Sequence, residues 1–251
     1  MSTTTVATAN VLCDLSRADA AEALDGVLAA GPDLVGLQEW SALRLGVLRR
    51  RGRVTAVPAV RRTTGRGGWV WSAPLLGGCV VGADPARYDL LGARPVVLSR
   101  PGRADRGGRL GLESGRVATV GVYADRLTAR TVALVSYHLV SGVQRHDALR
   151  ADRPRLVARH THEVERLQAL VDRLLTAGHV VHAVGDANQH GFALEGLTSA
   201  WVGRPDHPGT LGERRRVDDV LGPGRATEVT LLRSASDHRA VVVRRPDAPG
   251  T

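Results

Sequence analysis

The chain has 251 residues, of which 43% are hydrophobic, and it carries a formal net charge of +9 at pH 7. Its two cysteines, Cys13 and Cys79, lack the spacing of a disulfide framework or a cysteine-based zinc site, and no apolar run reaches the roughly 18 residues of a membrane span. The N-terminus has no basic segment followed by an apolar stretch, so we expect no signal peptide. These features favour a cytoplasmic monomer with no membrane partner.

The basic charge comes entirely from arginine, because the sequence contains no lysine. Arginine makes bidentate contacts with phosphate, and the positive net charge favours a polyanionic substrate. A bias of the coding DNA toward GC is an alternative explanation for the lack of lysine. The aromatic content is only 3%, so a platform for stacking single-stranded bases would be poorly supplied.

The first quarter of the chain predicts a strand, a helix and a second strand. Residues 5–12 read as a strand, and Ser16 followed by Asp19 is typical of a helix N-terminus. Helical apolar spacing then covers residues 20–30 and ends at Gly31-Pro32. Residues 33–38 are almost wholly apolar, which predicts a buried strand.

The middle of the chain predicts mostly strands, with a short basic segment at residues 41–51 that has helical character. The strands are expected at residues 54–60, 78–83, 95–98, 117–124 and 131–139. Two segments rich in glycine and arginine, residues 61–68 and 100–109, are predicted to be loops.

The last 100 residues open with the strongest helix, residues 155–176, whose apolar side chains form one stripe and which ends before Gly178. Strands are then expected at residues 179–184, 217–221, 228–232 and 240–243. Many strands and two long helices predict an α/β fold in which two sheets pack face to face with helices outside. No composition shift or repeat divides the chain, so we expect one domain over residues 1–251 with frayed ends at about residues 1–4 and 246–251.

Polar motifs follow several of these strands in a fixed order. They are Asn10, Leu37-Gln38-Glu39, Tyr137-His138-Leu139, Gly185-Asp186-Ala187-Asn188 and Ser236-Asp237-His238. Taken together they resemble the endonuclease/exonuclease/phosphatase family, which includes pancreatic-type deoxyribonuclease and the apurinic endonucleases. The resemblance runs from about residue 5 to residue 243. It implies a four-layer α/β/β/α sandwich of two mixed, largely antiparallel sheets with flanking helices, and a metal-dependent phosphoesterase.

Glu39 and Asn10 are the candidate metal ligands. A carboxylate at the end of a buried strand is costly without a partner, and hard Mg²⁺ prefers oxygen ligands. By themselves, Glu39 could be the first solvated residue after a strand and Asn10 a turn residue. The resemblance implies that Glu39 is the principal ligand for Mg²⁺ or Mn²⁺ and that Asn10 lies beside it. We assign Asp237 as a further metal ligand.

His138, Asp186 and Asn188 are candidate catalytic residues. In isolation, His138 could be a histidine of the core or rim, and the Asp186–Asn188 pair could form an Asx-turn. The resemblance implies that His138 contacts the scissile phosphate and protonates an oxygen. The family usually has a bulky residue between the aspartate and the asparagine, whereas this chain has Ala187, so we expect different local packing.

His238 is the candidate histidine that activates water or holds the phosphate. A turn without function is the alternative for Asp237-His238. A catalytic histidine needs a carboxylate to fix its tautomer, and Arg216-Val217-Asp218-Asp219 resembles the segment that supplies it. We assign Asp218 to this role, with Asp219 as the alternative register.

Arg61, Arg62 and Arg66 in the first Gly/Arg loop are candidate substrate-binding residues, although solvated charge explains them equally well. A zinc cluster of His146, His160, His162 and Glu163 is disfavoured against a solvated helix, because the spacing does not match a metalloprotease helix.

The sequence therefore predicts Mg²⁺- or Mn²⁺-dependent hydrolysis of phosphodiesters, with nucleic acid as the substrate. A phosphatase or phosphodiesterase for a small or lipid phosphate is the first alternative, and a non-catalytic binding protein on the same fold is the second. The features that mark three branches of the family are missing: Thr-Lys after the Gln-Glu pair, a Trp-Cys-Asp-Arg segment, and a signal peptide with a disulfide. We therefore assign no branch.

Overall fold

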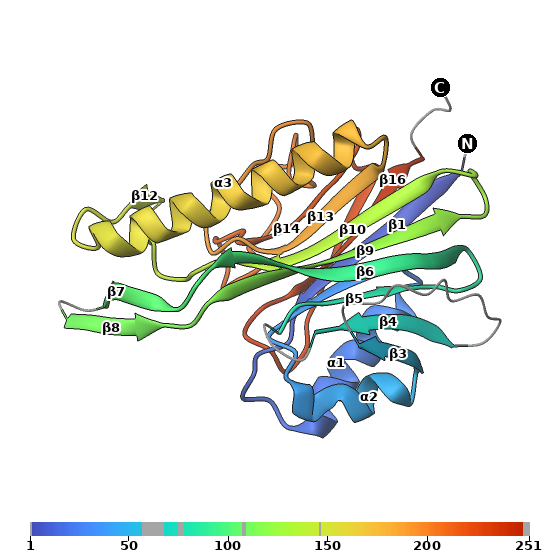
Figure 1. Cartoon of the computed structure of the whole chain (residues 1–251), viewed down its shortest axis with the longest axis horizontal. Helices are drawn as coiled ribbons and strands as arrows, with labels where there is room; N and C mark the ends of the chain where they lie inside the picture. The colour runs from blue at the N-terminus through green and yellow to red at the C-terminus, as the bar shows by residue number, and fades with distance from the viewer. Residues whose placement is uncertain (1, 57–67, 75–77, 107–108, 146, 248–251) are drawn as a thin grey trace.

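Two β-sheets lie face to face, and helices cover their outer surfaces (Figure 1). The computed structural model describes residues 2–56, 68–74, 78–106, 109–145 and 147–247. Within these ranges, none of the helices combines the length and the apolar character that a membrane-spanning helix requires.

The larger sheet has seven strands in the order β15-β16-β1-β2-β5-β4-β3. Their bounds are β1 Thr3–Asn10, β2 Leu34–Gln38, β3 Gly52–Ala56, β4 Trp69–Ala73, β5 Val80–Ala83, β15 Glu228–Leu232 and β16 Ala240–Pro246. The pairs β1/β2 and β3/β4 are parallel, and the other four pairs are antiparallel.

The smaller sheet has five strands in the order β14-β13-β10-β9-β6. Their bounds are β6 Tyr88–Ser99, β9 Arg116–Asp125, β10 Thr131–His138, β13 Val180–Asp186 and β14 Asp218–Leu221. Only β10 and β13 run parallel. Both sheets are thus mixed and largely antiparallel, as predicted.

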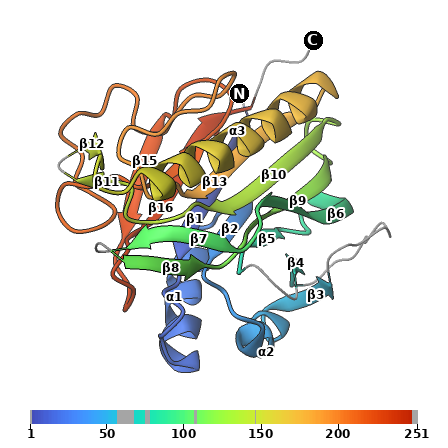
Figure 2. The same cartoon turned by 60° about the vertical axis from the view of Figure 1, so that its left-hand side comes forward.

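Two long helices flank the sheets. Helix α1 (Arg17–Ala29) begins at Ser16, whose hydroxyl accepts the Asp19 N–H, as the sequence predicts. A 3₁₀ turn (Ala42–Arg44) and the short α2 (Leu45–Arg49) lie on the same side as α1 (Figure 2). Helix α3 (Pro154–Thr176) crosses the outer face of the five-stranded sheet.

Three apolar clusters fill the spaces between these layers, which makes the four-layer α/β/β/α sandwich that was expected. The central cluster, with Leu34, Leu134 and Val184, lies between the sheets. A second cluster joins α3 to the five-stranded sheet, and a third joins α1 and α2 to the seven-stranded sheet. Gly36 brings the sheets close together, because a Cβ there would lie 2.2 Å from Val184 Cγ2.

The structure corrects several predicted elements. The Gly/Arg segment 100–109 is not a loop, because β7 (Gly102–Arg106) and β8 (Arg109–Glu113) form an antiparallel hairpin that projects beyond the sandwich (Figure 1). The short strand predicted at 95–98 is the end of the twelve-residue β6. Strand β4 was not predicted at all. Strand pairing overrides local composition in each case.

The chain ends are more ordered than predicted. Thr3 pairs with Pro246 and Thr4 pairs with Arg245, so residues 3, 4 and 246 belong to strands. Arg87 fixes this corner, because its guanidinium donates to the carboxylates of Asp125 and Asp247 at 2.8 and 2.9 Å.

A small hairpin of β11 (Gln144–Arg145) and β12 (Ala148–Leu149) completes the described elements.

The parallel pairs β1/β2 and β10/β13 decide where polar side chains gather. All four strands end at the same rim of the sandwich, where the antiparallel β14 and β16 begin. The rim therefore collects Asn10, Glu39, His138, Asp186 and Asp218. Below it, Gln38 spans the space between the sheets, accepting from Thr8 Oγ1 at 3.1 Å and donating to Ser136 Oγ at 3.0 Å.

Candidate active site

The rim opens into a cleft of about 630 Å³. Its walls come from loops after β1, β2, β10 and β13, from the start of β9, and from the segments around residues 211–215 and 237–238. The residues that line it are Cys13, Glu39, Ser41, Gly78, Arg116, His138, Ser141, Gly142, Asp186, Asn188, Leu211, Arg215, Asp237 and His238. The sequence-predicted residues Glu39, His138, Asp186, Asn188, Asp237 and His238 are thus brought together.

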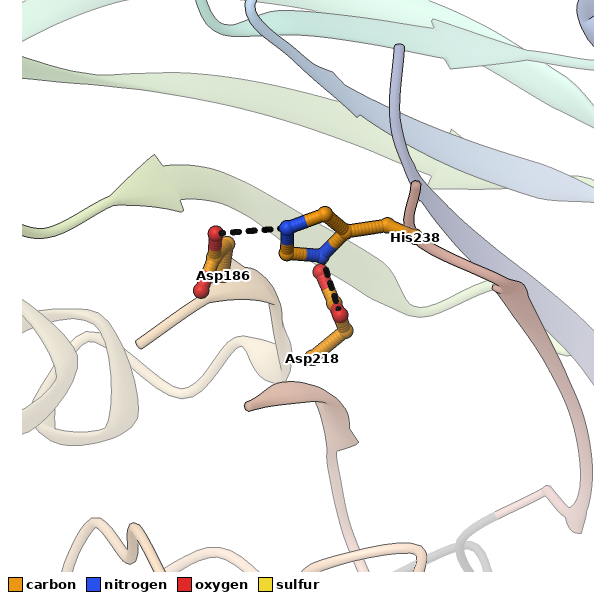
Figure 3. Close-up of side chains that lie close together, drawn as sticks. All are labelled: Asp186, Asp218 and His238. Carbon is orange, nitrogen blue, oxygen red and sulfur yellow. Dashed lines mark hydrogen bonds and ion pairs between the residues drawn. The ribbon is translucent and has the colours of Figure 1, made fainter. Parts of the chain in front are cut away.

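His238 lies between two carboxylates (Figure 3). Its Nδ1–H donates to Asp218 Oδ2 at 2.7 Å, and its Nε2 lies 3.8 Å from Asp186 Oδ2. The backbone reinforces this placement, because Ser236 Oγ accepts the His238 N–H at 3.3 Å and donates to Asn10 O at 2.7 Å. The ring is therefore held in one orientation with Nε2 directed toward Asp186.

The structure answers the question of register in the Asp218-Asp219 pair. Successive residues of β14 face opposite sides of the sheet. Asp218 faces His238, whereas Asp219 accepts from Ser199 Oγ and from the Ala200 N–H at 2.5 and 3.0 Å on the other side. Asp218 is thus the carboxylate that contacts the histidine.

The charge state of His238 follows from these neighbours. Burial disfavours the imidazolium, but the hydrogen bond and the charge of Asp218, together with Asp186 and Asp237, raise the pKa of His238 to about 9. The ring is protonated at neutral pH, and both of its nitrogens are donors.

Asp186 is buried at the centre of the cleft. Burial and the charge of Asp218 raise its pKa to about 7, although His238 and the hydrogen bonds from Asn188 N and Asn10 Nδ2 oppose the rise. The Asn188 N–H reaches Asp186 Oδ1 at 2.7 Å, and Asn188 Nδ2 donates to Leu139 O at 3.0 Å. Asn188 thereby joins the loops after β13 and β10, and it adopts a left-handed φ of 53° to do so.

His138 also lies close to Asp186. Its Nε2 is 3.5 Å from Asp186 Oδ2 and 4.0 Å from Glu39 Oε1. Burial and the charge of Arg116 lower the pKa of His138 to about 3, against the opposing effect of Glu39. The ring is neutral at physiological pH, which suits a hydrogen-bond donor better than a proton source.

Glu39 and Asn10 form the wall opposite His238. Asn10 Nδ2 donates to Glu39 Oε1 at 3.2 Å and to Asp186 Oδ2 at 3.1 Å, and the Cys13 N–H donates to Glu39 Oε2 at 2.9 Å. Glu39 has a φ of 56°, a left-handed conformation that is uncommon outside glycine and turns its side chain into the cleft. Burial opposes ionisation, but the hydrogen bonds from the Cys13 N–H and from Asn10 Nδ2 lower the pKa of Glu39.

These residues fit a hard divalent cation. Within the described residues, the buried Asn10 Oδ1 has no hydrogen-bond partner, and it lies beside the ionised Glu39 carboxylate. Both are oxygen donors of the kind that Mg²⁺ prefers. Asp186, Asp218 and His238 also place one potential ligand atom each within 4.8 Å of one another. Asn10 Nδ2 contacts both Asp186 Oδ2 and Glu39 Oε1, so Asp186 is the member of this group that is placed to share a cation with Glu39 and Asn10.

Four candidate residues remain, and the structure describes one of them. Asp237 lines the cleft, but its side chain is exposed. Arg61, Arg62 and Arg66 lie outside the described residues, so their assignment stays a prediction.

The sequence missed two cationic residues of the cleft, Arg116 and Arg215. The buried Nε of Arg116 has no hydrogen-bond partner among the described residues. Arg116 stands before the predicted strand 117–124 rather than at a strand end with a recognisable motif, so the sequence did not single it out. Arg215 stands in the run Arg214-Arg215-Arg216, for which phosphate contact and solvated charge are equally good explanations from the sequence, and only the fold separates the three.

Three buried polar residues behind the site were also missed. Arg44 donates to the carbonyl oxygens of Val11, Leu12, Cys13 and Leu15 at 2.6 to 2.9 Å, which fixes the loop that holds Glu39. The expectation that His160 and Glu163 are solvated is wrong, because their exposed fractions are 3% and 0%.

His160 and Glu163 connect α3 to the two central loops. His160 Nε2–H donates to Ala187 O at 2.8 Å, and Glu163 Oε2 accepts the Val140 N–H at 2.8 Å. Glu163 Oε1 also accepts from Ser99 Oγ and Arg159 Nε at 2.6 and 3.1 Å. One turn of α3 thus fixes the two segments that follow His138 and Asp186 in the chain. The small, buried Ala187 lies directly against this turn.

Comparison with known proteins supports the fold. No protein-family model and no curated protein matches the sequence. Among solved structures, D. rerio TDP2 complexed with a single-strand DNA product is 16% identical, with a TM-score of 0.67 over 97% of this chain and 99% of that chain. An endonuclease/exonuclease/phosphatase family protein from Bacteroides thetaiotaomicron is 15% identical, with a TM-score of 0.63 over 97% and 94%. A mannosyl-6-phosphatase from the same species is 15% identical, with a TM-score of 0.62 over 96% and 98%.

The chain therefore has the fold of the endonuclease/exonuclease/phosphatase proteins. The resemblance inferred from the ordered motifs is confirmed at this level.

Proposed function

We propose that this protein is a Mg²⁺- or Mn²⁺-dependent hydrolase of phosphodiester bonds and that its substrate is nucleic acid. The observation that carries the proposal is the arrangement around Asp186, with the His238–Asp218 pair on one side and Glu39 with Asn10 on the other. The likeness in fold to a TDP2 complexed with single-strand DNA and the net charge of +9 support the choice of nucleic acid.

Asn10, Glu39 and Asp186 have the proposed roles of binding the cation and accepting a proton. A bound divalent cation would polarise the phosphoryl oxygens and offset their charge. Asn10, Glu39 and Asp186 would hold this cation. Asp186 Oδ2 lies within 4 Å of Nε2 of both histidines, and this carboxylate would also accept a proton from the attacking water.

The two histidines hold the phosphate rather than act as bases. Protonated His238 donates from Nε2 to a phosphoryl oxygen, while Asp218 keeps the ring in place through Nδ1. Neutral His138, which also lies close to Asp186, donates a hydrogen bond. Preorganised donors of this kind stabilise the charge that develops on the phosphoryl group.

A substrate panel tests the proposal. We expect an oligonucleotide and bis(p-nitrophenyl) phosphate to be hydrolysed with Mg²⁺ or Mn²⁺ and to be spared in EDTA. His238→Ala provides the matched control for a contaminating enzyme. An absence of hydrolysis of every phosphoester with either metal would contradict the proposal and support the non-catalytic alternative.

A small phosphate ester is the second candidate substrate. The likeness in fold to a mannosyl-6-phosphatase and the cleft volume of about 630 Å³, which lies in the usual range for small-molecule sites, support it. Salt separates the two candidates, because binding of a polyanion weakens steeply as salt increases. Hydrolysis of hexose 6-phosphate that exceeds that of an oligonucleotide at every salt concentration would favour the small substrate.

A further inference from the structure

Three consecutive arginines, Arg214, Arg215 and Arg216, have different surroundings in the folded chain. Arg216 donates from Nε and Nη2 to His207 O at 3.0 and 2.6 Å, and its guanidinium lies 5.6 Å from the centre of the Trp201 ring. Arg214 is exposed and does not line the cleft. Arg215 is exposed and lines the cleft. Only one of the three therefore offers its charge to a molecule in the cleft.

The backbone of Arg215 is fixed although its side chain is exposed. The N–H groups of Thr210 and Leu211 both donate to Arg215 O, at 2.8 and 3.0 Å. Arg239 fastens the base of this turn through Gly209 O at 3.0 Å and the Glu213 carboxylate at 2.5 Å. Within the described residues, no hydrogen bond or ion pair engages the Arg215 guanidinium. The turn thus presents an unpaired cation at a defined place.

That place is offset from the catalytic centre. Leu211 forms a β-bridge to Arg215 on one side and to His238 on the other. Neighbouring strands are about 4.8 Å apart, so the backbone of Arg215 lies roughly 10 Å from that of His238. Arg116, by contrast, lies close enough to His138 for its charge to act on that ring. Arg116 therefore lies near the acidic centre of the cleft, and Arg215 lies farther along the cleft wall.

We propose that Arg215 binds a second phosphate of the substrate, next to the phosphate that reacts. The inference rests on the proposed phosphoesterase function and narrows its substrate class to molecules with at least two phosphate groups. Arginine suits this role, because its planar fork donates two hydrogen bonds to phosphate and it remains charged at every physiological pH. A nucleic-acid chain and a small bisphosphate both supply a second phosphate.

The experiment compares substrates that differ by one phosphate. For a chain, the pair is a thymidine dinucleotide with and without a terminal phosphate, tested at each end. For a small molecule, the pair is hexose 6-phosphate and hexose 1,6-bisphosphate. We expect the unmodified protein to prefer the member with the additional phosphate by about tenfold in kcat/KM, the size expected for one charge-assisted contact. The pair that shows the preference identifies the source of the second phosphate.

Arg215→Gln should abolish this preference, because kcat/KM should fall about tenfold more for the member with the additional phosphate than for the single-phosphate member. Arg214→Gln is the matched control, because it removes the same charge from an exposed neighbour outside the cleft, and it should leave the preference intact. Equal loss in both variants would reduce the effect to net charge and overturn the inference. A preference that survives Arg215→Gln would also overturn it.

The failure of this inference can be distinguished from failure of the proposed function. If no substrate is hydrolysed, the proposed function fails, and equilibrium binding of the same substrate pairs still tests Arg215. Tighter binding of the member with the additional phosphate, lost in Arg215→Gln and kept in Arg214→Gln, supports the second-phosphate site. Equal binding of both members by the unmodified protein contradicts it.

Discussion

The Nε2 atoms of His138 and His238 both lie within 4 Å of Asp186 Oδ2, and yet one ring is neutral and the other is protonated at neutral pH. His238 Nδ1 donates to Asp218 Oδ2 at 2.7 Å, and the pKa of His238 is about 9. His138 is buried near the charge of Arg116, and its pKa is about 3. Each histidine follows or precedes a strand in the same rim, so position in the fold does not separate them. Burial and the neighbouring charged groups set the charge, and hence the chemistry, of each ring.

The largest expected effect is the loss of the protonated histidine. His238→Ala should lower kcat/KM for bis(p-nitrophenyl) phosphate by about 10³-fold, within the range for loss of a positioned catalytic side chain. Asp218→Asn should cost less, and the double variant should be little worse than His238→Ala, because the two residues act as a unit. Thermal unfolding checks that the variants are folded.

Asp219→Asn is the control for this pair, since Asp219 contacts Ser199 and Ala200 on the opposite face of β14. It should leave kcat/KM near that of the unmodified protein. Near-full activity of His238→Ala would disprove the assigned role of His238, and a crippling effect of Asp219→Asn would show that the Asp218 assignment is wrong.

The second effect concerns Glu39, the proposed metal ligand. Glu39→Gln keeps the shape of the side chain but removes a hard anionic ligand. Metal affinity and turnover should fall together, by about tenfold or more, and additional Mg²⁺ should restore part of the rate. A metal titration followed both by activity and by calorimetry checks this. Titration curves that match those of the unmodified protein would show that Glu39 is not a ligand.

A smaller effect is expected from the helix behind the site. In Glu163→Gln, an amide N–H₂ would face the donors that Glu163 now accepts from Ser99, Arg159 and Val140. We expect kcat to fall about tenfold with little change in KM, because the loop after His138 loses its fixed position. Glu165→Gln is the control on the exposed side of the same helix. A change in melting temperature with kcat unaffected would reduce Glu163 to a purely structural role.

The smallest effect is a shift in one pKa, and it tests the comparison directly. The charge of Arg116 disfavours the imidazolium of His138. Arg116→Gln should therefore raise the pKa of His138 from about 3 toward the ordinary value of 6.5, in the presence of EDTA. NMR titration of the histidine ring protons measures it, with Arg214→Gln as the control. An unchanged pKa would mean that the charge of Arg116 does not act on His138.

Much of the site could be predicted from the sequence because its residues stand at strand ends. Asn10, Glu39, His138 and Asp186 each follow an apolar run, and parallel strands bring such ends to one rim. The hairpin of β7 and β8 could not be predicted in this way, because its glycines and arginines resemble a loop and only pairing between the two strands makes them extended.

The sequence by itself determined the order of the motifs and the residue types that meet in the cleft, because strand-end position is a local property. The mixed sandwich was implied by the family resemblance that these motifs carry. The tertiary structure alone decided which aspartate faces His238, which arginine of the run 214–216 lines the cleft, and which helix residues are buried behind it. It also decided that His138 is neutral and His238 is protonated at neutral pH. Burial and electrostatic interaction depend on groups distant in sequence, such as Arg116 for His138 and Asp218 for His238, so no local pattern records them.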